Sequence, residues 1–207
     1  MALIHEATLV PTKIELLEAW LPGRRWFAGD SPPKDLDRVG ACRFDDPAGE
    51  VGIEIFVVRD VDGPLLHAPM TYRGAPLPGG EPWLIGTTEH SVLGTRWVYD
   101  AAGDPVYVAA LAEAIRTGGR EAPEFVDTPD GEVPREPLMS VRGGGHQAPG
   151  STAEIVRVDE GDPTVVLTNI GELAIRRVLT DTPPDAALTL TATWPGHPSP
   201  IVLAVLS

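Results

Sequence analysis

The sequence is poor in the residues that build disulfides and metal sites. It has 207 residues and a single cysteine, Cys42, so no disulfide can form within the chain. Its five histidines, at positions 5, 67, 90, 146 and 197, do not recur at the spacings of metal ligands. The first residues lack the basic segment and the long apolar run of an export signal. We therefore expect a cytoplasmic protein with no metal, no other cofactor and no membrane segment.

Positive charge is also scarce. Lysine and arginine together number 16 against 30 aspartates and glutamates, which gives a formal net charge of −14 at pH 7. A surface of this sign repels the phosphates of nucleic acids and the headgroups of anionic lipids. The charge balance excludes nucleic acid and membrane surfaces as expected partners.

The motifs of common catalytic classes are missing. No serine lies in the Gly-x-Ser-x-Gly pattern of hydrolases. A kinase catalytic loop places an Asp five residues before a magnesium-binding Asn, whereas the single asparagine, Asn169, has Thr164 at that position. The run Gly143–Gly145 is interpreted as a hairpin loop rather than a phosphate cradle, because a strand is expected after it. Leu173–Arg176 is interpreted as an ordinary strand ending in surface arginines. Phosphoryl transfer by this chain is unsupported.

Two segments carry helix signals. Thr12 and Glu15 form a capping box, and apolar residues recur at helical spacing behind them, which predicts a helix over residues 12–21. Asp104 is a typical N-cap residue, followed by proline, and two glycines stop the apolar pattern that it begins. This predicts a second helix over residues 105–117.

The remaining segments are predicted to be strands and loops. Between residues 38 and 100 apolar residues alternate with a period of two, which predicts an antiparallel sheet. Residues 118–137 are rich in Gly, Pro and charge, and are predicted to be a linker. Beyond it every signal is strand-like, for example over residues 164–168. We expect an α+β domain over 1–117, followed by a small all-β antiparallel domain over 138–207.

A few acidic and aromatic residues are weak candidates for ligand contact. Glycoside hydrolysis requires two carboxylates, and Glu54 and Glu89 are the best placed by sequence. Alternation nevertheless assigns Glu54 to a solvent face, and Glu89 precedes a predicted loop. Trp26, Trp83 and Trp97 offer flat apolar faces on which a sugar could stack, although core packing is the commoner use of tryptophan.

One segment resembles a known family. The stretch from Trp20 to Gly29 reads Trp-Leu-Pro-Gly-Arg-Arg-Trp-Phe-Ala-Gly. It is similar to the opening of the bacterial maltokinases, whose N-terminal cap has a helix ending in Trp-Leu-Pro-x-x-Arg-Trp-Phe/Tyr-x-Gly. The segment from Val98 to Pro105 resembles the closing strand and helix of that cap. The motif residues, to which we assign structural roles, are Trp20, Leu21, Pro22, Arg25, Trp26, Gly29, Tyr99 and Asp100.

The resemblance implies a cystatin-like cap, a helix packed on an antiparallel sheet, over residues 1–117. In the family this cap is joined to a kinase-like body that phosphorylates maltose with ATP. The cap itself carries no catalytic aspartates, so no catalytic residue is carried over to this chain. Trp26 is expected to pack below the helix end, and the guanidinium of Arg25 to pair with a nearby carboxylate.

Three functions follow as hypotheses. The first is a non-catalytic cap-like module that binds a protein partner or a sugar ligand in trehalose, maltose or α-glucan metabolism. The second is a small carbohydrate-active enzyme that uses Glu54 or Glu89. The third is a structural homodimer formed through sheet edges, because the strands predicted over 138–207 must pair or be covered.

Overall fold

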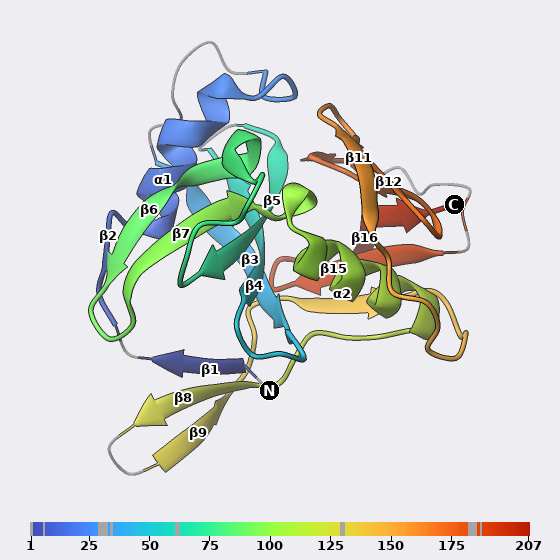
Figure 1. The fold of residues 1–207 in the computed structure, drawn as a ribbon. Helices are drawn as coiled ribbons and strands as arrows, with labels where there is room; N and C mark the ends of the chain where they lie inside the picture. Colours follow the sequence, from blue (N-terminus) through green and yellow to red (C-terminus); the bar gives the residue numbers. More distant parts are fainter. Residues whose placement is uncertain are drawn as a thin grey trace.

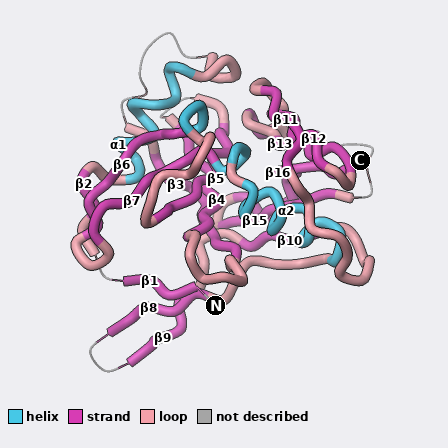
Figure 2. Tube along the Cα trace, in the orientation of Figure 1, coloured by secondary structure: helices cyan, strands magenta, loops and turns pink. Residues whose placement is uncertain are grey.

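The computed structural model describes residues 2–5, 7–28, 33, 35–60, 63–128, 131–181, 186 and 188–207. This part of the chain is mostly antiparallel strand, with two short α-helices, α1 (Lys13–Trp20) and α2 (Pro105–Thr117) (Figures 1 and 2). The arrangement is α+β and dominated by strands, as predicted in outline. Neither of these helices is long and apolar enough to cross a membrane.

The largest sheet has seven strands, in the order β2-β6-β7-β5-β4-β3, with β14 paired to the beginning of β5. All of its pairs are antiparallel. Six strands come from the N-terminal half, and β14 arrives from the C-terminal part. The bounds are β2 (Leu9–Val10), β3 (Asp37–Phe44), β4 (Gly52–Arg59), β5 (Leu65–Arg73), β6 (Leu84–His90), β7 (Gly94–Asp100) and β14 (Val178–Leu179).

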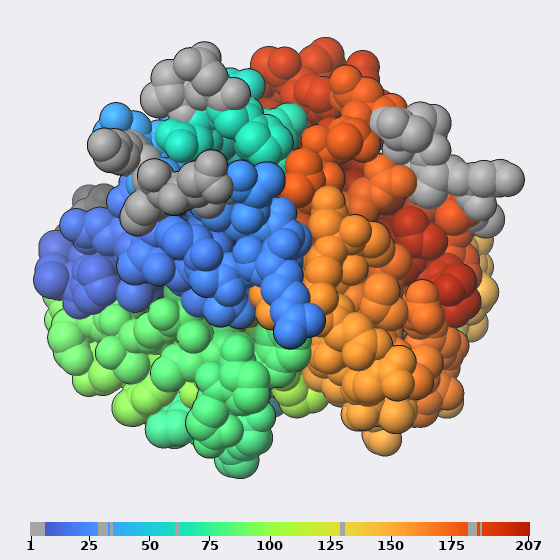
Figure 3. Space-filling model, turned by 90° about the horizontal axis from the view of Figure 1, so that it is seen from above, coloured from blue at the N-terminus to red at the C-terminus, as the bar shows by residue number. Residues whose placement is uncertain are grey.

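The second sheet has six antiparallel strands from the C-terminal part, in the order β10-β15-β16-β13-β12-β11. In the space-filling view the N-terminal part (blue) and this C-terminal part (orange to red) meet along one seam (Figure 3). The bounds are β10 (Ser140–Gly143), β11 (Ile155–Asp159), β12 (Thr164–Thr168), β13 (Gly171–Ile175), β15 (Thr189–Trp194) and β16 (His197–Leu206).

The third sheet lies at one end of the molecule (Figure 1). It consists of β1 (Ala2–His5), β8 (Glu124–Thr128) and β9 (Gly131–Arg135), with β1 parallel to β8 and β9 antiparallel to it. Strands β8 and β9 fall within the segment whose composition predicted a linker. The Pro and Gly content there did not prevent pairing, because β9 is an edge strand, where proline is tolerated.

Both helices begin directly after their predicted N-caps, and α1 (Lys13–Trp20) lies within the predicted range 12–21. The Thr12 hydroxyl accepts a hydrogen bond from the backbone N–H of Glu15, and the Glu15 carboxylate accepts one from the N–H of Thr12. Asp104 caps α2 through the N–H of Val106, and Gly118 ends it with a left-handed backbone, φ +74°. The helix predicted over 105–117 is confirmed.

Strand β4 divides the interior into two cores. Ile53, Ile55 and Val57 face the core shared by α2 and the six-stranded sheet. Phe56 and Val58 face the smaller core beneath α1. Both faces of this strand are therefore buried, a pattern that alternation between apolar and polar residues does not reveal.

The glycine run 143–145 lies against the C-terminal end of α2. Its three backbone N–H groups donate to the carbonyls of Gly119, Thr189 and Ile115, at 2.8–2.9 Å. A Cβ atom at position 143 would overlap the carbonyl oxygen of Ala114. The run thus caps the helix by close backbone approach, and its N–H groups are not available to cradle a phosphate.

Candidate functional site

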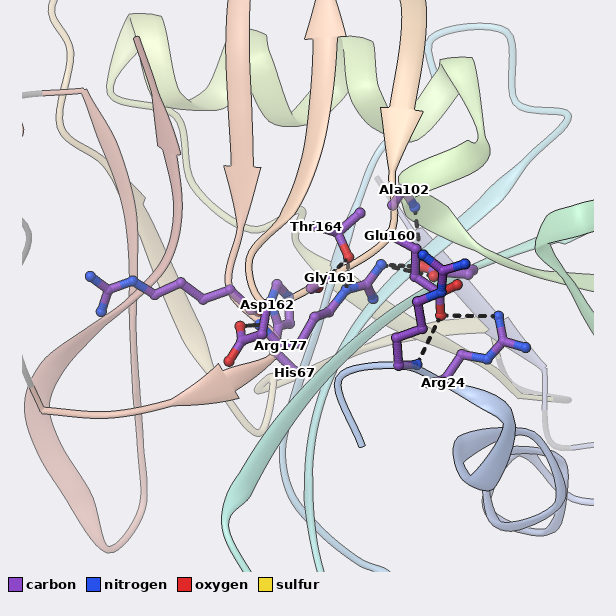
Figure 4. A network of polar contacts seen from close by, with 11 residues as sticks. Arg24, His67, Ala102, Glu160, Gly161, Asp162, Thr164 and Arg177 are labelled. Atoms are coloured by element: carbon purple, nitrogen blue, oxygen red, sulfur yellow. Dashed lines mark hydrogen bonds and ion pairs between the residues drawn. The ribbon is translucent and has the colours of Figure 1, made fainter. Parts of the chain in front are cut away.

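A buried polar network is centred on Arg177, between β13 and β14 (Figure 4). One terminal nitrogen, Nη2, donates to both carboxylate oxygens of Asp100 at 3.0 and 2.8 Å, and Nε donates to the Thr164 hydroxyl at 2.8 Å. The backbone N–H of Arg177 donates to Asp162 at 2.8 Å. Arg177 is fully buried, contrary to the expectation of surface arginines at this strand end. The network joins a residue of the family motif, Asp100, to the C-terminal part.

The guanidinium of Arg177 also lies over Trp26, with its carbon 5.2 Å from the ring centroid. The Trp26 ring in turn packs edge-to-face on Trp20 at the end of α1, with centroids 5.9 Å apart and an interplanar angle of 65°. Behind them His67 is buried, with Nδ1 2.9 Å from the carbonyl oxygen of Arg176. Burial, aided by the charge of Arg177, lowers the pKa of His67 to about 3, so the ring is neutral.

The other motif residues have varied positions. The carboxylate of Glu160 pairs with Arg24, whose Nη1 lies 3.4 Å away. The side chain of Arg25, which was predicted to pair with a nearby carboxylate, is exposed. Only the backbone N–H of Arg25 reaches Glu160, at 3.4 Å. The Tyr99 hydroxyl accepts a hydrogen bond from the N–H of Leu77. Leu21 is buried and Pro22 exposed, while Gly29 lies outside the described residues.

Glu54 is buried rather than solvent-facing, so its predicted placement is wrong. It lies on the α1 side of β4, where Lys13 Nζ and Arg43 Nη2 each donate to one of its carboxylate oxygens. Burial alone would raise the pKa of Glu54, but these two cations outweigh it and lower the pKa to about 2. Glu54 is therefore ionised at neutral pH, and each of its carboxylate oxygens takes part in an ion pair.

A cavity of about 1080 Å³ opens above this cluster, which we call the α1 cavity. Its floor is the part of the seven-stranded sheet that α1 leaves uncovered, including Phe56 and Tyr72. Its walls are the beginning of α1, the turn between β6 and β7, and β8 with β9. Lys13 Nζ lies 4.7 Å from the centroid of the Tyr72 ring. The cavity is thus lined by paired charges and aromatic rings.

A second hollow, of about 1260 Å³, runs along the outer face of α2 and is called the α2 groove. Val106, Ala109 and Ala110 provide its apolar floor, and Trp83 lies at its margin, directly against Gly103. The polar groups along its sides are the carboxylates of Asp45, Asp46, Glu113 and Glu154 and the guanidinium groups of Arg116 and Arg120. Of the weak candidates for ligand contact, Trp83 belongs to this groove and Glu54 to the α1 cavity, while Trp26 lines neither.

Glu89 and Trp97 also lie outside both hollows. Glu89 is exposed on β6, where it accepts a hydrogen bond from the Thr95 hydroxyl at 2.7 Å. Trp97 is half-buried on β7 and lines neither hollow. The structure therefore does not gather the predicted candidates into one site. Among the described residues, no group of His, Cys, Asp and Glu side chains could hold a metal ion.

Sequence reasoning missed Arg177, Lys13 and Arg43. Arg43 lies directly opposite Glu54 in the pairing of β3 with β4, a relation that follows from register and not from a motif. Lys13 reaches Glu54 because α1 packs on that sheet face. Arg177 follows Arg176 at a strand end, and nothing in the sequence separates the two.

These features define a strand-rich α+β module with two hollows and a buried polar network between its halves. Residues 20–104 match the family model of the maltokinase N-terminal cap domain. The match runs from Trp20, at the end of α1, to Asp104, the N-cap of α2, and confirms the resemblance. This part of the chain is therefore similar to the maltokinase N-terminal cap domain. No curated protein matches the chain at a significant level.

Proposed function

We propose that the chain is a non-catalytic, maltokinase-related module that binds a neutral sugar of the maltose, trehalose or α-glucan class. The observation that carries the proposal is the α2 groove. An apolar floor with an aromatic ring at its margin suits the C–H face of a pyranose, and flanking carboxylates suit its hydroxyls. The groove carries more carboxylates than guanidinium groups, which disfavours anionic ligands.

Three observations support a binding role over a catalytic one. The carboxyl group of Glu54 cannot serve as the acid of a glycosidase, because its pKa is lowered to about 2, whereas that acid needs a raised pKa. The N–H groups of Gly143–Gly145 are already used within the fold. Thr164, at the position of a kinase catalytic Asp, holds Arg177 instead. The second hypothesis, an enzyme using Glu54 or Glu89, is therefore the weaker one.

The domain organisation belongs to the same proposal. We propose that residues 1–117 form a cystatin-like cap, in which α1 packs on the seven-stranded sheet, that 118–137 connect it to the rest, and that 138–207 form a second, all-β unit. The packing of Leu16, Leu17 and Trp20 against the face of that sheet supports the first assignment.

A protein partner is the second candidate, and one sheet edge favours it. Strand β11 ends the six-stranded sheet, and Val156 on it is 66% exposed. An exposed edge of this kind is a site for pairing with another strand. A second copy of the chain would serve equally, so sedimentation should then report a mass that rises with concentration. A concentration-independent monomer would exclude the homodimer.

The sugar hypothesis is tested by calorimetric titration with maltose, maltotriose and trehalose. Trp83→Ala should weaken binding about 10-fold or more, because it removes the stacking surface. Trp97→Ala is the matched control, since Trp97 is also half-buried but lies outside the groove. No binding of any of these sugars, or equal loss in both variants, would contradict the proposal.

The proposal that the chain is not a catalyst is tested by a separate assay. The purified chain is incubated with ATP and maltose, and release of ADP is followed by a coupled reaction. We expect no turnover above that of a blank. Sustained turnover would contradict a non-catalytic role even if the groove binds sugar.

A further inference from the structure

The α2 groove follows one face of its helix from the first turn to the last. The helical residues along it recur at i, i+3, i+4 and i+7, the spacing of neighbours on one face. From Pro105 to Arg116 the helix advances 11 residues, which is about 16 Å at 1.5 Å per residue. The residues on this face are all half-buried, and they are Val106, Ala109, Ala110, Glu113, Arg116 and Thr117. The groove therefore extends along the helix and is not confined to one end of it.

The two ends of the groove differ in chemistry. At the N-terminal end of α2, Trp83 packs so closely on Gly103 that a Cβ atom at position 103 would overlap its ring. This contact fixes the ring at the margin of the groove, beside the apolar half of the helix face. At the C-terminal end the lining is polar, with Glu113 and Arg116 on the helix and Ser151 on the loop that follows β10. A ligand along the helix would contact an aromatic ring at one end and charged and hydroxyl groups at the other.

Arg116 holds the loop that forms the wall of the groove at this polar end. The loop passes the C-terminal end of α2 and leads into β11 (Figure 1). Its Gln147 N–H donates to the Arg116 carbonyl at 2.9 Å, and Arg116 Nε donates to the side-chain oxygen of Gln147 at 3.3 Å. Arg116 Nη1 donates to the carbonyl of Ser151 at 3.0 Å, and the guanidinium lies directly against Gly150. One side chain thus fixes both ends of residues 147–151, which we call the strap.

The guanidinium of Arg116 keeps donors for a ligand. Among the described residues no carboxylate pairs with it, and no acceptor takes a hydrogen bond from its Nη2 group. The Glu113 carboxylate lies three residues earlier on the same helix face. A sugar hydroxyl both donates and accepts hydrogen bonds, so a carboxylate next to a guanidinium group can bind neighbouring hydroxyls of one ring. The polar end of the groove therefore suits an uncharged ring that carries several hydroxyls.

We propose that the ligand of the α2 groove is a linear α-glucan of three or more glucose units, with one ring stacked on Trp83 and a later ring bound by Arg116 and Glu113. The inference rests on the proposed function, sugar binding in this groove, and adds the length of the ligand. A disaccharide stacked on Trp83 has only one further ring, which ends short of Arg116. The small side chains of Ala109 and Ala110 let the middle of a longer chain lie close to the helix. The groove volume of about 1260 Å³ also exceeds the range of about 300–1000 Å³ that is usual for small-molecule pockets.

The experiment titrates the full chain by calorimetry with maltose, trehalose, maltotriose and maltotetraose. We expect maltotetraose to bind about 5-fold or more tightly than maltose, because only the longer sugar contacts both ends of the groove. A smaller ratio would overturn the inference on ligand length and leave sugar binding in place. Absence of binding by all four sugars would contradict the proposed function itself, and the inference with it.

Arg116→Gln should lower the ratio of maltotetraose affinity to maltose affinity about 5-fold or more, because the guanidinium contacts only the longer sugar. Arg116→Lys keeps the charge and a donor, so it should restore part of that ratio. Arg142→Gln is the control, an exposed arginine on β10 that does not line the groove, and should leave the ratio unchanged. An unchanged ratio in Arg116→Gln, or an equal loss in Arg142→Gln, would overturn the proposal.

A second variant separates contact with the sugar from support of the strap. Amide hydrogen exchange over residues 147–151 reports whether Arg116→Gln has loosened the strap. The Glu113 carboxylate makes no hydrogen bond to the strap among the described residues, so Glu113→Gln keeps the strap contacts and should lower the same affinity ratio. Faster exchange in Arg116→Gln together with an unchanged ratio in Glu113→Gln would assign Arg116 to the strap alone and overturn the proposed contact with the sugar.

Discussion

Replacing Arg177 by methionine tests the buried network directly. Methionine retains much of the side-chain volume but removes the guanidinium, so the Asp100 carboxylate keeps a hydrogen bond from the N–H of Ala102 alone, at 3.2 Å. The Asp100 side chain is only 2% exposed, so water cannot replace the lost donors. Breaking a buried pair in this way costs about 3–5 kcal/mol.

For a domain of this length, each kcal/mol corresponds to about 2–4 °C in melting temperature, so Arg177→Met should melt about 6–20 °C lower. Urea unfolding followed by tryptophan fluorescence is a suitable assay, because Trp26 lies beneath the guanidinium. Replacing both partners, as Arg177→Met with Asp100→Leu, should cost at least about 1 kcal/mol less than the sum of the single changes. A loss below 1 kcal/mol, or strict additivity, would refute the reasoning.

Three further predictions concern stability. Thr12→Ala should lower the free energy of unfolding by about 1 kcal/mol in urea titrations, because the capping box of α1 is lost. The pKa of His67 is about 3 when folded and near 6.5 when unfolded, so stability is full above pH 6.5 and falls as the pH drops. Urea titrations across pH 4–6.5 give the free energy of unfolding at each pH. Its slope against pH should be shallower by up to about 1.4 kcal/mol per pH unit in His67→Leu, but unchanged in the control His146→Gln, where the replaced residue is exposed. Gly143→Ala should lower the melting temperature severely, since its methyl group would overlap the Ala114 carbonyl; a normal melt would contradict the close packing.

The local signals in the sequence predict the helices well. Helix α2 begins and ends where Asp104 and Gly118 predict, because capping depends on neighbours in the chain. Strand β12 likewise has its predicted bounds, Thr164–Thr168. The outline of an α+β fold with antiparallel sheets follows from the same local patterns.

The candidate site depends on contacts that local patterns do not encode. Glu54 was assigned to a solvent face because alternation implies one polar side, whereas both faces of β4 are covered by different parts of the chain. Arg177 is buried because Asp100, 77 positions earlier, lies opposite it in space. Strands β8 and β9 are stabilised by pairing with each other and with β1, despite a loop-like composition.

The two-sided burial of β4 also bears on whether the segment that matches the cap model can be moved into another protein. One face of β4 carries Ile53, Ile55 and Val57. This face is covered partly by Leu173 and Leu203 of the C-terminal sheet, and not by the matched segment alone. A cap with this sequence, grafted onto another protein, would carry an uncovered apolar face unless the host supplied a matching one. The C-terminal strands thus cover this face of the matched segment, so changes in apolar side chains on one side require compensating changes on the other.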